Sequence, residues 1–114
     1  MRRYRLPKCK ILRTKKDIQQ LFREGRYFPG RHFDLVVRTD VVDSKVLFTV
    51  SKKIRKKVFR NRIKRRLREV YRLNQYEIPA PLHIAMIGKA GALTADFQQL
   101  QAEFKQILSK IMDS

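Results

Sequence analysis

Apolar residues recur at helical spacing in three parts of the chain. In the first part, Ile18, Leu21 and Phe22 lie between Thr14, a residue suited to an N-cap, and Gly25, a residue that commonly ends helices. This combination of cap, apolar face and stop predicts a short helix with one face directed towards a core.

A second and longer helix is predicted over residues 55–74. With about 100° of rotation per residue, Phe59, Ile63, Leu67 and Val70 fall within about 80° of one another and form one apolar face. A third helix is predicted after Thr94, which is expected to be its N-cap, with apolar residues at Phe97, Leu100, Phe104, Ile107, Leu108 and Ile111. Each of these helices is expected to pack on another layer of structure.

Alternating apolar positions predict the strands. Two alternating runs, at residues 33–37 and 46–50, are separated by a polar segment and are predicted to form a pair of antiparallel strands. The apolar run over 82–88 predicts a further strand, and a short additional strand is expected over 27–30. The order is α-β-β-β-α-β-α, which indicates an α/β (α+β) two-layer sandwich with a roughly four-stranded sheet in a single domain, 1–114.

Positive charge is concentrated in the first two thirds of the chain. The chain has 28 Lys and Arg against 10 Asp and Glu, a formal net charge of +18, and residues 1–74 hold 25 of those cations but only six of the acids. Such a charge density attracts polyanions through counterion release, so the expected partner is nucleic acid or an anionic membrane. No apolar run approaches the ~20 residues that span a bilayer, so nucleic acid is favoured and no membrane role is expected.

The sequence shows no catalytic or metal-binding constellation. Cys9 is the only cysteine, so neither an internal disulfide nor a cysteine-based zinc site is expected, and no secretory signal is predicted. His32 and His83 are far apart in sequence, and no close acidic pair would hold two metals. We therefore expect a cytoplasmic protein with no catalytic residue, metal ligand or cofactor of its own.

The strongest local signal is a run of cations that begins where the 46–50 strand ends. Ser51-Lys52-Lys53 is followed on the predicted helix by Arg60-Asn61-Arg62, and the face opposite the apolar one carries further cations at Lys64, Arg65, Arg68 and Arg72. Like charges three and four residues apart repel one another on a helix, which favours an anionic ligand over a merely solvated face. Arginine forks bind phosphate and stack on bases, while asparagine both donates and accepts hydrogen bonds.

This pattern closely resembles the signature of the bacterial ribonuclease P protein family. The resemblance rests on the Arg60-Asn61-Arg62 triplet and the preceding Ser51-Lys52-Lys53, and it extends over nearly the whole chain, from Leu6-Pro7-Lys8 to the closing strand and helix. It implies that the 46–51 and 82–88 strands are parallel and joined by a left-handed crossover, whereas general rules favour a right-handed one. It also implies binding of a catalytic RNA and of the 5′ leader of precursor tRNA, with the magnesium ions required by the RNA of the holoenzyme.

The resemblance assigns the RNA contacts to particular residues. On the signature helix they are Arg60, Asn61, Arg62, Lys64, Arg65 and Arg68. At the strand end and among the N-terminal basic residues they are Ser51, Lys52, Lys53, Lys56, Lys57, Lys8 and Arg13. An apolar and aromatic cleft for the leader is expected at Ile18, Phe22, Phe33, Val36 and Phe48.

Spacing alone favours the core for these five cleft residues, because aromatics at helical or strand spacing are more often buried than ligand-binding. The resemblance favours the cleft for Phe22. Relatives often have phenylalanine in place of Ile18, and some have an aromatic in place of Val36, so stacking at these two positions stays open.

Composition by itself leaves three other functions open. A ribosomal or other structural RNA-binding protein would have a similar charge, and a DNA-binding protein would place the basic helix in a major groove. A nuclease that acts without RNA is the enzymatic alternative. The expected partners are the ribonuclease P catalytic RNA and precursor tRNA. Binding to DNA is not expected.

Overall fold

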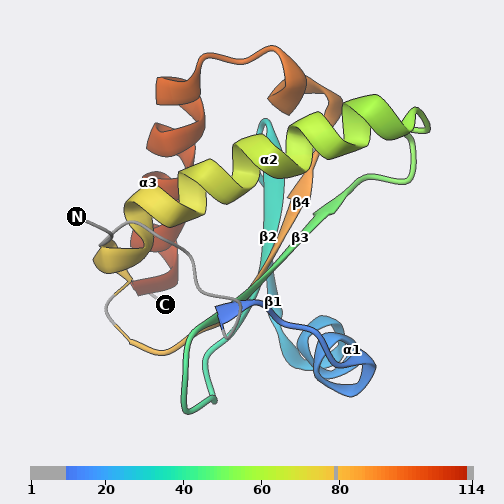
Figure 1. Ribbon diagram of the computed structural model, residues 1–114. Helices are drawn as coiled ribbons and strands as arrows, with labels where there is room; N and C mark the ends of the chain where they lie inside the picture. Colours follow the sequence, from blue (N-terminus) through green and yellow to red (C-terminus); the bar gives the residue numbers. More distant parts are fainter. Residues whose placement is uncertain (1–9, 79, 113–114) are drawn as a thin grey trace.

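Three helices and a four-stranded sheet make up the part of the chain described by this computed structural model, residues 10–78 and 80–112 (Figure 1). The elements are α1 (Lys15–Glu24), β1 (Arg26–Phe28), β2 (Phe33–Arg38), β3 (Lys45–Val50), α2 (Lys57–Asn74), β4 (His83–Gly88) and α3 (Phe97–Met112). Two short 3-10 helices, η2 (Gln75–Glu77) and η3 (Ala90–Leu93), follow α2 and β4. This is the α-β-β-β-α-β-α order expected from the sequence.

The strands lie in the order β1-β2-β4-β3 across the sheet. β2 is antiparallel to both β1 and β4, and β3 is parallel to β4. The prediction that β2 and β3 pair with each other is wrong, because β4 lies between them. β4 is buried at nearly every position whereas β3 alternates, and a strand buried on both faces belongs in the middle of a sheet. The parallel β3-α2-β4 connection agrees with the family resemblance, and its left-handed crossover stays a prediction.

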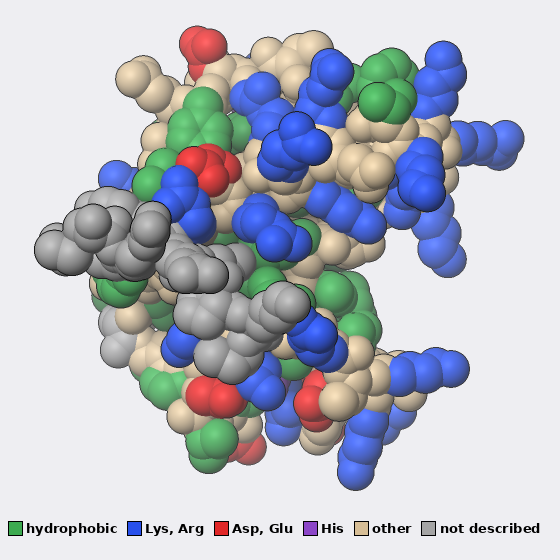
Figure 2. Space-filling view, viewed as in Figure 1, with side chains coloured by type: hydrophobic (Ala, Val, Ile, Leu, Met, Phe, Trp, Pro, Cys, Tyr) green, Lys and Arg blue, Asp and Glu red, His purple; other side chains and the backbone are tan. Residues whose placement is uncertain are grey.

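Charged side chains cover much of the surface around this framework (Figure 2). Among the described residues, no helix is long and apolar enough to cross a membrane.

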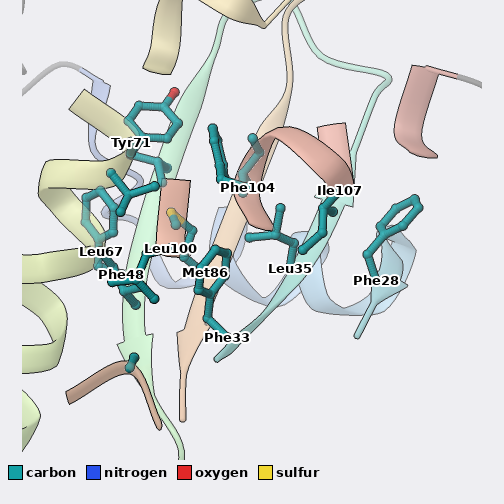
Figure 3. Packing of buried hydrophobic residues seen from close by; sticks show 14 of the residues in the cluster. Phe28, Phe33, Leu35, Phe48, Leu67, Tyr71, Met86, Leu100, Phe104 and Ile107 are labelled. Atoms are coloured by element: carbon teal, nitrogen blue, oxygen red, sulfur yellow. The ribbon is translucent and has the colours of Figure 1, made fainter. Parts of the chain in front are cut away.

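Helices α2 and α3 cover one face of the sheet and enclose the larger core (Figure 3). The apolar face of α2 is buried as its periodicity predicts: Ile63, Leu67 and Val70 are all 0% exposed, whereas Phe59 at the start of the helix is only half-buried. Tyr71 packs edge-on against Phe48 and Phe104, with ring centroids 6.0 and 6.2 Å away. Burial raises the pKa of the Tyr71 phenol to about 12.

A glycine lets α2 lie close to the sheet. A Cβ atom at Gly88, the last residue of β4, would overlap Cγ2 of Ile63 and lie 3.2 Å from Cδ1 of Leu67. The N-terminal half of α2 can therefore sit directly on β4, which fixes where its cationic side is presented.

Helix α1 lies on the opposite face of the sheet. The side-chain oxygen of Thr14 accepts a hydrogen bond from the backbone N–H of Asp17, and the helix ends at Gly25, as the sequence predicts. Leu21 packs in a second, smaller core with Leu12, Val36 and Ala85. The expected sandwich of sheet and helices is confirmed, with helices on both faces of the sheet.

The last helix begins at Phe97, the first residue of its apolar pattern, but its expected cap is wrong. Thr94 follows η3 and donates its backbone N–H to the carbonyl of Gly91, whereas α3 starts at Phe97. The carbonyl of Asp96 accepts from the N–H groups of Gln99 and Leu100 and begins the helix. Because a short 3-10 turn intervenes, the expectation that Thr94 caps α3 is wrong.

Candidate nucleic-acid interface

The solvent side of α2 carries the cations of the predicted signature. Asn61, Arg62, Arg65 and Arg68 are exposed and Lys64 is half-buried. In the space-filling view, Lys and Arg side chains gather over this helix and over the loop that precedes it (Figure 2). The division of α2 into an apolar and a cationic face is thus confirmed, and the role of the cationic face in RNA binding stays a prediction.

The loop of residues 51–56, between β3 and α2, is held in a defined conformation. Ser51 donates its N–H to the carbonyl of Gly88 at 2.9 Å, and Ile54 donates to the carbonyl of Ser51 at 3.1 Å. The guanidinium of Arg60 donates to the carbonyls of Ser51 at 3.0 Å and Ile54 at 2.7 Å. The loop therefore presents the exposed Lys52 and Lys53 from a fixed backbone, and Arg60 is partly engaged in holding it.

Other arginines of α2 also make contacts within the protein. Arg66 donates to the carbonyl of Ala95, and Arg72 pairs with Glu69, its Nε donating at 3.0 Å. That hydrogen bond holds the pKa of Glu69 below its ordinary value. The guanidinium of Arg68 lies 5.6 Å from the centre of the Phe48 ring, within cation–π range. The cations of α2 are therefore not equivalent, although the helical wheel treats them alike.

The surface between α2 and α1 is hollowed. Figure 2 shows a concave surface between the N-terminal half of α2, with the 51–56 loop, and α1, and Lys and Arg side chains stand on both of its rims. Lys15, Lys16 and Arg23 of α1 are exposed, as is Arg13 just before this helix. We call this surface the α1–α2 hollow. Phe22 of α1 is 45% exposed, so its ring is accessible to a ligand.

The structure divides the five expected cleft residues between two faces of the sheet. Phe33 and Phe48 are 0% and 8% exposed and belong to the core beneath α2 and α3, whereas Ile18 and Val36 pack on the α1 side. Their prediction as one continuous cleft is wrong. Successive strand residues face opposite sides, so Phe33 and Val36, three positions apart, cannot share a face. Only Ile18, Phe22 and Val36 remain on the α1 side.

Lys8 lies outside the described residues. The other predicted contacts at the strand end occupy the 51–56 loop and the first turn of α2, where Lys56 and Lys57 are exposed and Ser51 is half-buried. The Lys56 ammonium lies 5.6 Å from the centre of the Phe59 ring. The structure thus gathers the cations of the strand end and of the signature helix into one continuous surface.

A polar cluster at the β1 edge of the sheet was missed by sequence reasoning. The Tyr27 hydroxyl donates to Oδ2 of Asp34 at 2.6 Å, and Oδ1 of Asp34 accepts from the Gly30 N–H and from the Lys89 ammonium, both at 2.9 Å. Burial by itself would raise the pKa of Asp34, but the hydrogen bonds from Tyr27, Gly30 and Lys89 outweigh it and hold this pKa below its ordinary value. The weak alternation of the 27–30 segment gives no local sign of these contacts.

A separate pocket of about 530 Å³ lies between the β1–β2 turn and α3. Glu103 lines this pocket. Its carboxylate accepts hydrogen bonds from the backbone N–H groups of His32 at 3.0 Å and Phe33 at 3.3 Å, and it also contacts Nδ1 of the His32 ring at 2.8 Å. These contacts satisfy Glu103 within the fold. Among the described residues there is also no cluster of three or more His, Cys, Asp or Glu that could hold a metal ion.

These features define a class: a small, basic α+β protein whose cationic helix and loop form a surface suited to a polyanion. The chain belongs to the ribonuclease P protein family, since the model of the family Ribonuclease P matches residues 6–112. The ribonuclease P protein component of Desulfovibrio desulfuricans is 33% identical, and the match covers 97% of this chain and 89% of the relative. That of Geotalea uraniireducens is also 33% identical, with 97% and 98% covered.

Solved structures agree with this membership. The RNase P protein from Thermotoga maritima superimposes with a TM-score of 0.75 at 26% identity, covering 88% of this chain and 96% of that one. The Staphylococcus aureus RNase P protein has a TM-score of 0.74 at 23% identity, with 90% and 94% covered, and supports the fold alone. Family membership makes the chain a protein component of ribonuclease P, an endoribonuclease complex of tRNA processing, and implies an RNA subunit as its partner.

Proposed function

We propose that this protein binds both the catalytic RNA subunit and the single-stranded 5′ leader of precursor tRNA, and so assists removal of the leader. The observation that carries the proposal is the α1–α2 hollow, with exposed cations on both rims, together with the exposed Phe22 of α1, the helix that forms one rim. A single strand needs phosphate neutralisation along its backbone and apolar or aromatic surfaces for its bases. The hollow combines the two.

In this proposal the protein supplies binding and electrostatics, and the RNA subunit supplies hydrolysis and holds the magnesium ions. The exposed cations of α2 bind phosphates of the catalytic RNA and, at Arg68, of the precursor, while the hollow receives the leader. Lys52 and Lys53 are exposed on the 51–56 loop, whose backbone is held by Arg60. The protein acts in the cytoplasm, where it meets newly made tRNA precursors.

Cleavage of a precursor tRNA by the RNA subunit alone, the protein alone and both together tests this function. We expect the mixture to cleave at the mature 5′ end faster than the RNA alone, above all at low magnesium, and the protein alone to cleave nothing. Cleavage by the protein alone would instead establish a self-contained nuclease. If the mixture cleaves the precursor no faster than the RNA alone, the proposal that the protein assists cleavage is wrong.

Replacement of Arg68 with Ala should make binding of the leader-bearing precursor less sensitive to salt. For single strands, log K falls with log salt by about 0.7 per phosphate neutralised, so the loss of one contact should flatten the slope by up to about 0.7. Arg68→Lys retains the charge but not the planar group over Phe48, and should keep the wild-type slope. The measurement is holoenzyme affinity over a salt series, and equal slopes for wild type and Arg68→Ala would remove Arg68 from the phosphate contacts.

A further inference from the structure

Tyr27 is an exposed aromatic residue whose backbone belongs to β1 and whose hydroxyl group is fixed by a hydrogen bond. Its side chain is 59% exposed, yet its hydroxyl donates to the carboxylate of Asp34, which is itself 8% exposed. Asp34 is fixed in turn by the Gly30 N–H and by Lys89, whose ammonium also donates to the Gly30 carbonyl at 2.8 Å. The ring is therefore presented to solvent in one orientation, although most exposed side chains sample several.

The register of the strands places Tyr27 at the end of a row that crosses the whole sheet. Leu47 is paired with Ala85, Ala85 with Val36, and Val36 with Tyr27, and residues paired in this way share one face. Ala85 and Val36 are covered in the small core beside α1, whereas Tyr27 at the β1 end is open. Tyr27 thus adds an exposed aromatic ring to the α1 side of the sheet, beside the aliphatic side chain of Val36.

The charges around Tyr27 suit a nucleic acid. The Asp34 carboxylate would repel phosphates, but the Lys89 ammonium contacts it at 2.9 Å and offsets its charge. The side chain of Lys89 is 40% exposed, so part of it is also accessible. The pairing of Asp34 with Lys89 therefore reduces the repulsion that a nucleic acid would meet beside the Tyr27 ring.

We propose that Tyr27 is a base-stacking residue for the single-stranded leader, and that Asp34 is the positioning residue that holds its ring. The inference rests on the proposed function and adds a second stacking site to that at Phe22. A base stacks on an aromatic side chain largely regardless of its identity, because every base has a π-face. A ring that is already fixed loses little conformational freedom when a base stacks on it.

The position of Tyr27 predicts a dependence on leader length. Adjacent strands lie about 4.8 Å apart, so β1 stands roughly 14 Å from β3, which borders the α1–α2 hollow. The row between them is covered by α1, so a leader that enters at the hollow must pass around this covered region and reaches Tyr27 at the β1 edge only with its more distant nucleotides. Loss of the ring should therefore affect long leaders and spare short ones.

The test compares holoenzymes reconstituted with wild-type protein, Tyr27→Ala and Tyr76→Ala, using precursors with leaders of increasing length. Tyr76, in η2 beyond the C-terminal end of α2, is also 59% exposed and is the matched control. We expect Tyr27→Ala to weaken binding of the long-leader precursor about five-fold or more and to leave mature tRNA unaffected. Tyr27→Phe, which keeps the ring but loses its anchor, should fall between wild type and Tyr27→Ala, and Tyr76→Ala should bind like wild type.

A fluorescent variant gives a readout that a purely structural role would not change. The chain contains no Trp, so Tyr27→Trp introduces a single reporter that retains an aromatic face. Its emission should be quenched by a long-leader precursor and remain unchanged with mature tRNA, while Tyr76→Trp should respond to neither.

Two negative results have different meanings. Wild-type affinity for every leader in Tyr27→Ala, or emission from Tyr27→Trp that is indifferent to the leader, overturns the role of Tyr27 and leaves the leader function intact. A wild-type holoenzyme that binds long-leader precursor and mature tRNA equally well overturns both the leader function and this inference.

Discussion

Replacement of Leu67 with Ala is expected to lower the free energy of unfolding by about 2 to 5 kcal/mol. Leu67 is 0% exposed and lies beneath α2 beside Gly88, where the helix touches the sheet. Removing its side chain leaves a cavity. Because α2 already lies in close contact with the sheet at Gly88, the helix cannot move inward to fill that cavity. Urea unfolding followed by circular dichroism measures the change, and RNA binding should be lost only in proportion to folding.

The matched control is Arg65→Ala, two residues away on the exposed side of α2. It should leave the free energy of unfolding within about 0.5 kcal/mol of wild type, because surface substitutions usually do, and should weaken binding of the RNA subunit. The opposite pattern, with Arg65→Ala unfolded and Leu67→Ala stable, would mean that the two faces of α2 are reversed.

Replacement of Phe22 with Ala is expected to weaken holoenzyme binding of a leader-bearing precursor about ten-fold or more, and to leave binding of mature tRNA almost unchanged. Stacking of one base on an aromatic ring contributes about 1 to 3 kcal/mol, which corresponds to that loss. The ring is 45% exposed, so its removal should cost far less stability than the roughly 3 to 5 kcal/mol of a buried phenylalanine.

Leu21→Ala is the control for this result. Leu21 is adjacent in sequence but 0% exposed in the small core beneath α1, so its loss should destabilise the protein and reduce all activities together. If Phe22→Ala behaves in the same way, with a large loss of stability and no difference between leader-bearing and mature tRNA, then Phe22 belongs to the core and the leader is held by cations alone.

Helix α2 illustrates how well local patterns predict local structure. Its apolar face, its opposing cations and its place after β3 all follow from a period of 3.6 residues, because each residue's direction is set by its neighbours on the same helix. The N-cap at Thr14 and the end of α1 at Gly25 are predictable for the same reason. The role of Arg60 is not, since the carbonyls of Ser51 and Ile54 come within its reach only when the loop folds back.

The expected leader cleft conflicts with the periodicity of the strand that carries two of its residues. Phe33 and Val36 differ by an odd number of positions on β2, so the same alternation that predicts this strand also directs their side chains to opposite faces. Their separation therefore follows from the sequence. The burial of Phe48, in contrast, depends on Tyr71 and Arg68 of α2 lying over β3.

The amino-acid sequence by itself determined the elements, their order, the amphipathic character of the helices and the cationic surface, because these depend on residues close together in the chain. Its signature residues also indicated the family that the comparisons show. Only the tertiary structure decided that β4 separates β2 from β3, that Phe22 is open while Phe33 is closed, and that Lys89 reaches Asp34 to fix Tyr27. These features depend on pairing between distant segments, where burial of the most apolar strand and close packing at Gly88 select one arrangement from several that the local patterns allow.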